Sequence, residues 1–307
     1  MTNDASWRAA ALAAGAVEHG PHEALELRGA PVARALCEGL APRVRALANH
    51  GHTPCLAVVR VGEQPGDLAY ERGARSRMAK VGIDFEARAL PDDVTQGELE
   101  TCLRELDASG RVSGVLLLRP LPRHLDAEAA AACVSASKDV DGMTLTSLAA
   151  TFAGHGEGFA PCTAEAVVRL LEHYQVPLSG ARIVVLGRSL VVGRPVAQLL
   201  LARDATVTIC HSRTSDLSEE CCRGDVVVSC MGRAGSVRGD MLAPGAFVAD
   251  VGTNDDGNGD ITGDVRFSEA LGVAAGVTPV PRGVGSVTTS VLAEHVVRAA
   301  ELAAGVR

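Results

Sequence analysis

A glycine-containing turn between a predicted strand and a predicted helix is the first feature of this sequence that can do chemistry. Residues 183–186 are an apolar run typical of a buried strand, and residues 187–194 lead from it to Pro195, where we expect a helix to begin. Gly187 permits a tight turn, and Gly193 lets the helix start close to a ligand, so backbone N–H groups and the helix dipole would face a pyrophosphate. Because the spacing differs from G-x-G-x-x-G, the turn alone also fits a plain strand–helix connection.

The end of the next predicted strand indicates which dinucleotide would bind. Domains that prefer NAD usually carry an acidic residue there, which holds the ribose diol. Here residues 206–210 are followed by His211, Ser212, Arg213 and Thr214, so no carboxylate would repel a 2′-phosphate. Ser212 and Arg213 are able to bind such a phosphate, and Arg188 would reach it from the first turn. Each residue alone also fits a solvated loop, and together they predict NADP.

Apolar strands that alternate with helices place both turns in an α/β fold. The predicted strands are residues 55–61, 84–90, 114–118, 182–186, 206–210, 225–230 and 246–251. The predicted helices are residues 31–47, 68–81, 95–108, 163–174, 195–202 and 287–304. This alternation implies right-handed crossovers and parallel sheets.

A length of 307 residues favours two domains. Residues 149–161 have little apolar periodicity, so we place a domain boundary near residue 155. The expected organisation is an N-terminal extension of uncertain order at residues 1–26, with one possible helix, and a substrate domain formed by residues 27–155 plus 286–307. A Rossmann-type NADP-binding domain is expected at residues 156–285.

Composition excludes several classes of function. The net charge of −8 gives no basic footprint for nucleic acid or an anionic membrane, and no apolar run reaches the ~20 residues that span a bilayer. Nine cysteines without a C-x-x-C pair, and nine histidines without H-x-x-x-H spacing, predict neither a disulfide scaffold nor a metal site. The first residues lack a cationic signal-peptide region, so we expect a cytoplasmic protein. Lys80 and Lys138 are the sole lysines.

A series of short motifs in one order resembles a known family, the bifunctional methylenetetrahydrofolate dehydrogenase/methenyltetrahydrofolate cyclohydrolases, over residues 27–305. The motifs are Val61-Gly62 with Pro65 and Tyr70, Pro120-Leu121-Pro122, Lys138-Asp139-Val140-Asp141-Gly142, Pro161-Cys162-Thr163, the turn from Gly187 to Pro195, Cys210-His211-Ser212, Asp250-Val251-Gly252, Gly263-Asp264-Val265, and Thr278-Pro279-Val280-Pro281 through Gly285.

This resemblance implies a fold, an activity and a set of site residues. It implies two α/β domains with a folate cleft between them, a homodimer formed through the nucleotide-binding domain, hydride transfer from 5,10-methylenetetrahydrofolate to NADP, and addition of water to give 10-formyltetrahydrofolate. Asp141 matches the Asp that holds the pterin, and Tyr70 matches a Tyr beside the reacting carbon. Cofactor contacts are expected at Gly187, Arg188, Ser189, Gly193, Pro195, His211, Ser212, Arg213, Gly232 and Thr253. Substrate contacts are expected at Tyr70, Leu118, Asp141, Pro281 and Gly283.

Two positions of the family's water chemistry have changed together. The family carries a Lys one helical turn after the Tyr, and a Gln bonded to that Lys before its Pro-Leu-Pro run; here they are Ala74 and Leu118. Ala cannot relay a proton or orient water. Loss of one partner alone would strand a buried polar group at about 1–3 kcal/mol, so joint loss is coherent and indicates a reshaped site.

Further departures accompany this pair, and three functions remain open. The changed positions are Asp67, Ala74, Leu118, Ser147, Arg282 and Ser286. The first hypothesis is an NADP-dependent dehydrogenase that has lost efficient cyclohydrolase activity. The second is a specialised paralogue acting on a different carbon–nitrogen bond, and the third is a non-catalytic protein that binds folate or NADP.

Overall fold

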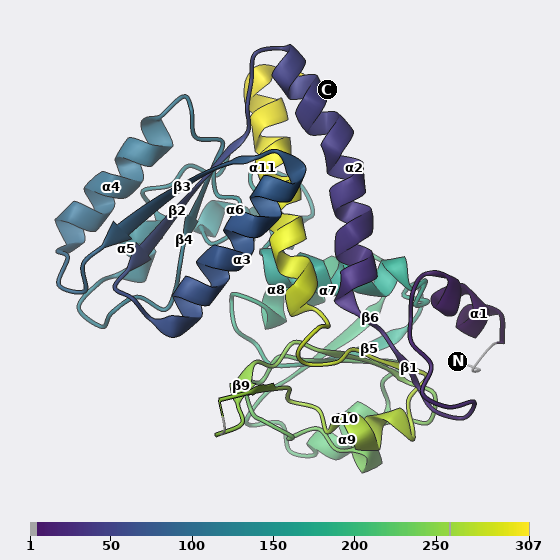
Figure 1. Ribbon diagram of the computed structural model, residues 1–307. Helices are drawn as coiled ribbons and strands as arrows, with labels where there is room; N and C mark the ends of the chain where they lie inside the picture. The colour runs from purple at the N-terminus through teal and green to yellow at the C-terminus, as the bar shows by residue number, and fades with distance from the viewer. Residues whose placement is uncertain (1–4, 258, 307) are drawn as a thin grey trace. The chain divides into compact units, whose positions relative to one another are not determined.

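The computed structural model describes residues 5–257 and 259–306, and its contacts divide the chain into two compact units (Figure 1). Unit 1 joins the chain up to Arg34 to Thr163–Thr288, and unit 2 joins Ala35–Cys162 to the chain from Thr289 onward. The sequence placed the boundaries at 155/156 and 285/286 and separated residues 1–26; the contacts instead group the described part of that segment with unit 1. Every strand pairing within the two main sheets is parallel, which confirms the predicted α/β class.

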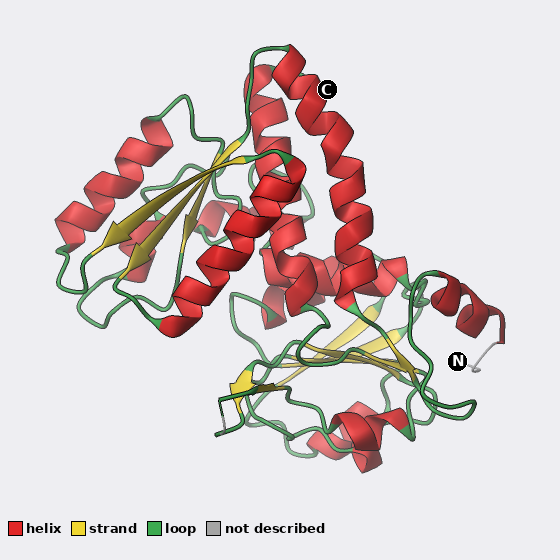
Figure 2. Ribbon diagram, in the orientation of Figure 1, coloured by secondary structure: helices red, strands yellow, loops and turns green. Residues whose placement is uncertain are grey.

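Unit 2 is built on three parallel strands in the order β3-β2-β4. They are β2 (Cys55–Val61), β3 (Asp84–Leu90) and β4 (Gly114–Leu117). The central strand β2 is buried along almost its whole length, because helices flank the sheet (Figure 2). Leucines of α4 (Gln96–Ala108) pack with Val59 and Val115, and α3 (Pro65–Val81) buries Ala74 and Met78. The three strands and both helices occur where the sequence predicts them, to within a few residues.

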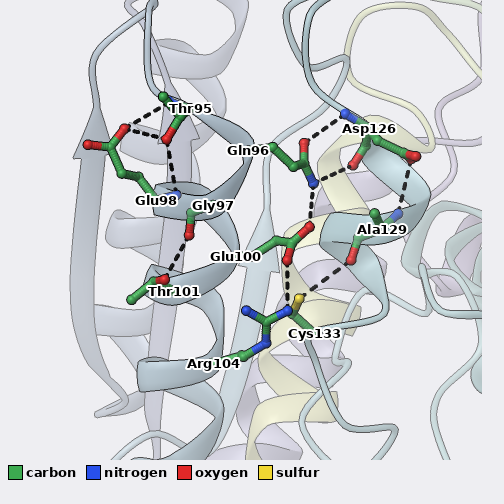
Figure 3. A network of polar contacts seen from close by, with 10 residues as sticks. All are labelled: Thr95, Gln96, Gly97, Glu98, Glu100, Thr101, Arg104, Asp126, Ala129 and Cys133. Atoms are coloured by element: carbon green, nitrogen blue, oxygen red, sulfur yellow. Dashed lines mark hydrogen bonds and ion pairs between the residues drawn. The ribbon is translucent and has the colours of Figure 1, made fainter.

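Polar side chains fix the start of α4 and connect it to the short helix α5 (Ala127–Ala131), as Figure 3 shows. Thr95 caps α4 by accepting a hydrogen bond from the Glu98 backbone N–H, while the Glu98 carboxylate accepts from the Thr95 backbone N–H at 2.9 Å. The Gln96 side chain accepts from the Asp126 backbone N–H, and the Asp126 carboxylate in turn caps α5. These bonds satisfy helix-terminal N–H groups that would otherwise lack partners.

Unit 1 contains a six-stranded parallel sheet in the order β1-β11-β8-β7-β5-β6. Its strands are β1 (Leu25–Glu26), β5 (Arg182–Leu186), β6 (Thr206–Cys210), β7 (Val226–Ser229), β8 (Phe247–Asp250) and β11 (Gly276–Val277). The chain passes from β5 to β6 on one side and then crosses to β7 on the other side. Such a reversal of strand order leaves a crevice at the carboxyl ends of the strands, where α/β domains bind ligands.

The remaining elements include two helices that the sequence predicted, at residues 163–174 and 195–202. The other elements are short, and the sequence did not predict them. Together these elements are α6 (Leu145–Ala153), α7 (Cys162–His173), α8 (Gly193–Leu201), α9 (Leu217–Cys222), α10 (Phe267–Leu271), the 3-10 helix η1 (Gly239–Met241), and the antiparallel pair β9 (Asn254–Asp255) and β10 (Ile261–Thr262). Two long helices, α2 (Gly29–Asn49) and α11 (Gly285–Ala304), begin among the residues of unit 1 and continue among those of unit 2.

The described part of the N-terminal segment is packed against unit 1. Helix α1 (Ala5–Ala13) lies on it through Trp7, whose indole N–H donates to the Tyr174 carbonyl at 2.8 Å and whose ring meets Phe247 edge-on at 4.6 Å. The segment then adds β1 to the edge of the sheet beside β11. Because its contacts lie far away along the chain, local sequence patterns did not reveal this order. In the described parts of the chain, no helix has the length and apolar character needed to cross a membrane.

Replacement of the single tryptophan measures the strength of this docking. Trp7→Ala is expected to lower the free energy of unfolding of unit 1 by about 2 kcal/mol, because a half-buried aromatic ring and its hydrogen bond are lost. The matched variant Trp7→Phe keeps the ring contact and is expected to lose about 1 kcal/mol. Urea unfolding followed by circular dichroism compares them, and an unchanged midpoint for Trp7→Ala would show that the segment does not stabilise unit 1.

Candidate active site

The predicted glycine turn lies at the carboxyl end of β5, and its two glycines are in close contact with backbone. Gly187 has a φ of +127°, and a Cβ there would lie 2.5 Å from the Cys230 carbonyl oxygen. A Cβ on Gly193 would lie 2.3 Å from the Gly187 carbonyl oxygen. Since real side chains do not make such approaches, both positions require glycine. The start of α8 is therefore held against the turn, with its N-terminal N–H groups at the strand ends.

Ser189 folds back within this turn. Its hydroxyl oxygen accepts hydrogen bonds from the backbone N–H groups of Val192 at 3.2 Å and Gly193 at 3.5 Å. Ser189 thus orders the turn itself, and its O–H retains the capacity to donate to an anion. Pro195 is buried in the first turn of α8, where its lack of an N–H is tolerated.

The turn after β6 starts beside the glycine turn, because Leu186 and Cys210 are register partners at the ends of neighbouring strands. The His211 backbone N–H donates to the Thr214 hydroxyl at 2.9 Å, and His211 Nδ1 accepts from the Arg213 backbone N–H at 3.2 Å. His211 therefore shapes the turn, while the side chains of Ser212 and Arg213 are exposed. Arg188 is exposed on the adjacent turn. These two turns bring hydroxyl and guanidinium groups to one edge of the sheet.

A buried carboxylate holds the third turn, at the end of β7, and sequence reasoning gave it no role. Asp264 is fully buried and accepts from the backbone N–H groups of Met231 and Arg233, each at 2.7 Å, and from the Ser229 hydroxyl at 3.0 Å. Gly232, with a φ of +64°, lies inside this turn. The motif Gly263-Asp264-Val265 drew attention to Asp264 in the sequence. The groups that hydrogen-bond to it are brought together only in the folded chain.

Asp250 supports the same region from the end of β8. It accepts from the backbone N–H groups of Gly252, Asp264 and Val265 at 2.9 to 3.1 Å, although burial raises the pKa of its carboxyl to about 6. A Cβ on Gly263 would lie 2.0 Å from an Asp250 carboxylate oxygen, so this packing excludes any larger residue. Thr253 follows β8 and is exposed.

In unit 2, the position on α3 where the resemblance predicts a lysine is Ala74. Tyr70 and Ala74 lie one turn apart on this helix, and Ala74 is completely buried. Leu118, after β4, is 7% exposed and lies where the resemblance predicts the family's glutamine. Burial raises the pKa of Tyr70 well above its ordinary value, and Asp141 and Cys162 raise it further. Tyr70 therefore stays protonated and can donate a hydrogen bond.

The loop that contains Asp141 is fixed by its neighbours. Asp139 is buried and accepts from the backbone N–H groups of Met143 at 2.9 Å and Thr144 at 2.8 Å. The Lys138 ammonium donates to the Ser109 carbonyl at 2.8 Å, and burial lowers the pKa of this lysine. Gly142 has a φ of +67°, and a Cβ there would lie 2.6 Å from the Phe159 carbonyl oxygen. One of the two lysines is therefore engaged in holding the loop.

Asp141 itself is strongly affected by its surroundings. Burial raises the pKa of its carboxyl to about 6, and Arg119 opposes that rise. The Arg119 Nη2 lies 3.5 Å from the Asp141 Oδ2. The sequence alone gave Arg119 no role, since the contact joins residues from two different loops.

Two further buried residues, Cys162 and His295, contact the peptide group before Asp141. The sequence alone gave neither of them a role. His295 Nδ1 is 2.8 Å from the Val140 carbonyl oxygen, so it is the donor in this bond. The Cys162 thiol donates to the same carbonyl at 3.2 Å and also hydrogen-bonds to Asp141, which lowers the pKa of that carboxyl. The peptide group that precedes Asp141 is thus held by two side chains.

Two of the other changed positions, Ser147 and Ser286, and two cations that follow Ala74 along α3 have defined surroundings. The Ser147 hydroxyl is fully buried, has no hydrogen-bond partner among the described residues, and lies against Gly158. Arg77 is directed to the Thr289 hydroxyl at 3.4 Å and the Cys37 sulfur at 3.6 Å, and Lys80 is exposed. Neither one replaces the missing lysine. Ser286 is half-buried at the start of α11.

The loop of residues 279–283 packs on the start of α2 in unit 1. Arg282 has a φ of +82° and is exposed, and its carbonyl accepts from the Gly29 backbone N–H at 2.8 Å. Gly283 is buried, and a Cβ there would lie 2.3 Å from the Pro279 carbonyl oxygen, whereas Pro281 is exposed. Among the described residues, no three His, Cys, Asp or Glu side chains are grouped to hold a metal ion.

These features define a two-domain α/β protein with a nucleotide-type turn system in unit 1 and a buried carboxylate site in unit 2. The family model for the tetrahydrofolate dehydrogenase/cyclohydrolase catalytic domain matches residues 27–141, and that for the NAD(P)-binding domain of the same family matches residues 161–304. The chain therefore belongs to the tetrahydrofolate dehydrogenase/cyclohydrolase family, which confirms the resemblance.

Individual relatives agree with this assignment. The chain is 46% identical to the bifunctional protein FolD of Alkaliphilus oremlandii over 276 residues, which cover 90% of this chain and 97% of that protein. A crystal structure of the bifunctional enzyme FolD from Campylobacter jejuni is 35% identical, with a TM-score of 0.87, and covers 90% of this chain and 98% of its own. FolD of Trypanosoma brucei, solved with NADP and an inhibitor, is also 35% identical with a TM-score of 0.87, and covers 91% and 98%.

Proposed function

We propose that this protein is an NADP-dependent methylenetetrahydrofolate dehydrogenase whose cyclohydrolase activity is lost or weak. The observation that carries the proposal is the burial of Ala74 and Leu118 at the two positions where the family has Lys and Gln. A methyl group and an isobutyl group offer no donor or acceptor for a proton or a water molecule. The polar pair associated with water addition has therefore been replaced by apolar packing.

The turns of unit 1 are the proposed cofactor site. The glycine contacts at Gly187 and Gly193 leave room for backbone to approach a pyrophosphate, and Ser189 would donate to it. Arg188, Ser212 and Arg213 would hold the 2′-phosphate, with His211 and Gly232 shaping their turns, and Pro195 and Thr253 completing the expected contacts. Bound NADP would supply the acceptor for a hydride from the substrate.

Tyr70 and Asp141 are the proposed substrate residues of unit 2. The Asp141 carboxylate would accept from the N–H groups of the pterin, and the protonated Tyr70 would donate near the reacting carbon. Leu118, Pro281 and Gly283 stay predicted substrate contacts. Hydride transfer depends mainly on alignment of the donor carbon with the nicotinamide, so it survives loss of a proton relay better than addition of water does.

A specialised paralogue that acts on a different carbon–nitrogen bond is the second candidate. It is favoured by the six positions that depart from the family's pattern, because these changes accompany cofactor turns that are kept. Turnover of methylenetetrahydrofolate at rates ordinary for an enzyme would count against this candidate.

A charge substitution tests the proposed cofactor preference. Wild-type protein is expected to form NADPH from methylenetetrahydrofolate and NADP, and Arg213→Ala is expected to raise the KM for NADP about tenfold with little change in kcat, because a charge-assisted hydrogen bond to phosphate is lost. The KM for NAD should not respond. Arg223→Ala, another exposed arginine of unit 1, is the matched control. Absence of NADPH formation by the wild type would contradict the proposal.

Restoration of the polar pair tests the proposed loss of water chemistry. The double variant Ala74→Lys, Leu118→Gln is expected to hydrolyse methenyltetrahydrofolate at least about tenfold faster than the wild type, since proton relays typically contribute about 100-fold or more. Ala74→Lys alone should be less stable and less active, because its buried ammonium lacks the Gln partner. Equal hydrolysis by wild type and double variant would place the water chemistry elsewhere.

We also propose a homodimer formed along the β6 edge of unit 1. β6 is the last strand of its sheet, and Ile209 on it is 38% exposed, with Leu201 nearby in sequence at 56%. Apolar groups on a terminal strand favour pairing with another chain. Sedimentation should give a dimer for the wild type and a monomer for Ile209→Lys; a monomeric wild type at micromolar concentration would refute this assembly.

The cytoplasmic location expected from the sequence stays a prediction.

A further inference from the structure

The contact between Arg119 and Asp141 creates a feature that the proposed function does not use. Arg119 follows β4, and its Nη2 lies 3.5 Å from the Asp141 Oδ2. The side chain of Arg119 is 27% exposed and that of Asp141 is 20% exposed, so both keep access to solvent. An arginine has five N–H donors and a carboxylate has about four lone-pair positions, so one mutual contact leaves both groups able to bind a ligand.

Arg119 differs in charge from the other groups that surround Asp141. Asp139 belongs to the same loop, Tyr70 approaches from α3, Cys162 begins α7 and His295 comes from α11. Of these groups and Arg119, the guanidinium alone keeps its positive charge across the whole pH range of proteins. Its charge stabilises the ionised form of a carboxylate that burial otherwise disfavours.

We propose that Arg119 is a specificity-determining residue that, together with Asp141, recognises a ring edge with an N–H donor next to a carbonyl oxygen. The carboxylate accepts from the N–H, and the guanidinium donates to the carbonyl. Such an edge is a cyclic amide, or lactam. The inference rests on the proposed folate site and deepens it, because the pteridine of a folate presents N3–H beside its 4-oxo group.

The same geometry disfavours a ring in which the carbonyl is replaced by an amino group. A 4-amino group presents donors toward the guanidinium donors, and it leaves both unpaired in a partly desolvated site. Sites built to hydrogen-bond a polar group reject analogues that lack it far better than apolar pockets do.

Binding of two stable ligands at pH 8 tests the inference without requiring turnover. Folic acid and its 4-amino analogue are titrated into the full chain by calorimetry, for wild type, Arg119→Leu, Arg119→Lys and Asp141→Asn. The wild type is expected to bind the 4-oxo compound at least about tenfold more tightly, and Arg119→Leu to reduce that ratio about fivefold or more by weakening the 4-oxo compound. Arg119→Lys keeps a cationic donor and should retain part of the preference.

The controls separate failure of this inference from failure of the proposed function. If both ligands bind and Arg119→Leu leaves their ratio within about twofold of the wild type, the role of Arg119 is refuted while the folate site stands. If the wild type binds neither ligand, the proposed folate site fails and the inference fails with it. Asp141→Asn should weaken both ligands. Thermal unfolding shows whether Arg119→Leu remains folded, and NMR titration of Asp141 should show a higher carboxyl pKa in that variant than in the wild type.

Discussion

The Asp141 carboxylate imposes the main constraint on the substrate half of this protein. Burial raises the pKa of this group to about 6, and the Arg119 charge and the Cys162 hydrogen bond oppose that rise. Asp139 fixes the loop that carries it, Cys162 and His295 hold the peptide before it, and Arg119 contributes the charge. Arg119 and the Cys162 hydrogen bond favour the charged form of this carboxylate, whereas the negative charge of Asp139 disfavours it.

The cofactor half depends on a different constraint, the close approach of backbone to backbone. Gly187 and Gly193 bring the start of α8 against the first turn, and the buried Asp264 gathers the N–H groups of the turn after β7. These contacts leave the polar side chains of the neighbouring turns exposed. The two halves therefore differ: unit 2 half-buries the carboxylate proposed to bind substrate, whereas unit 1 buries the supports and exposes the groups that would bind phosphate.

The sequence predicted the long elements because their apolar periodicity is local. β2, β3, β5 and β6 begin and end where the pattern places them, and the glycine turn follows from a strand next to a helix. Two-residue strands such as β1 and β11 have no detectable period and exist only through pairing with their neighbours. The Arg119–Asp141 contact and the Asp264 hydrogen bonds join residues from separate loops, so no single segment contains the signal. The docking of Trp7 was hidden for the same reason.

Replacement of the family's polar pair by Ala74 and Leu118 is proposed to have removed one half of its two-step chemistry. The most direct measurement is the rate at which wild-type protein converts methenyltetrahydrofolate to 10-formyltetrahydrofolate, compared with the spontaneous rate in the same buffer and without NADP. The account predicts a rate within about a factor of a few of the spontaneous one, because no side chain at these positions can relay a proton. Hydrolysis hundreds of times faster than the spontaneous reaction would contradict it.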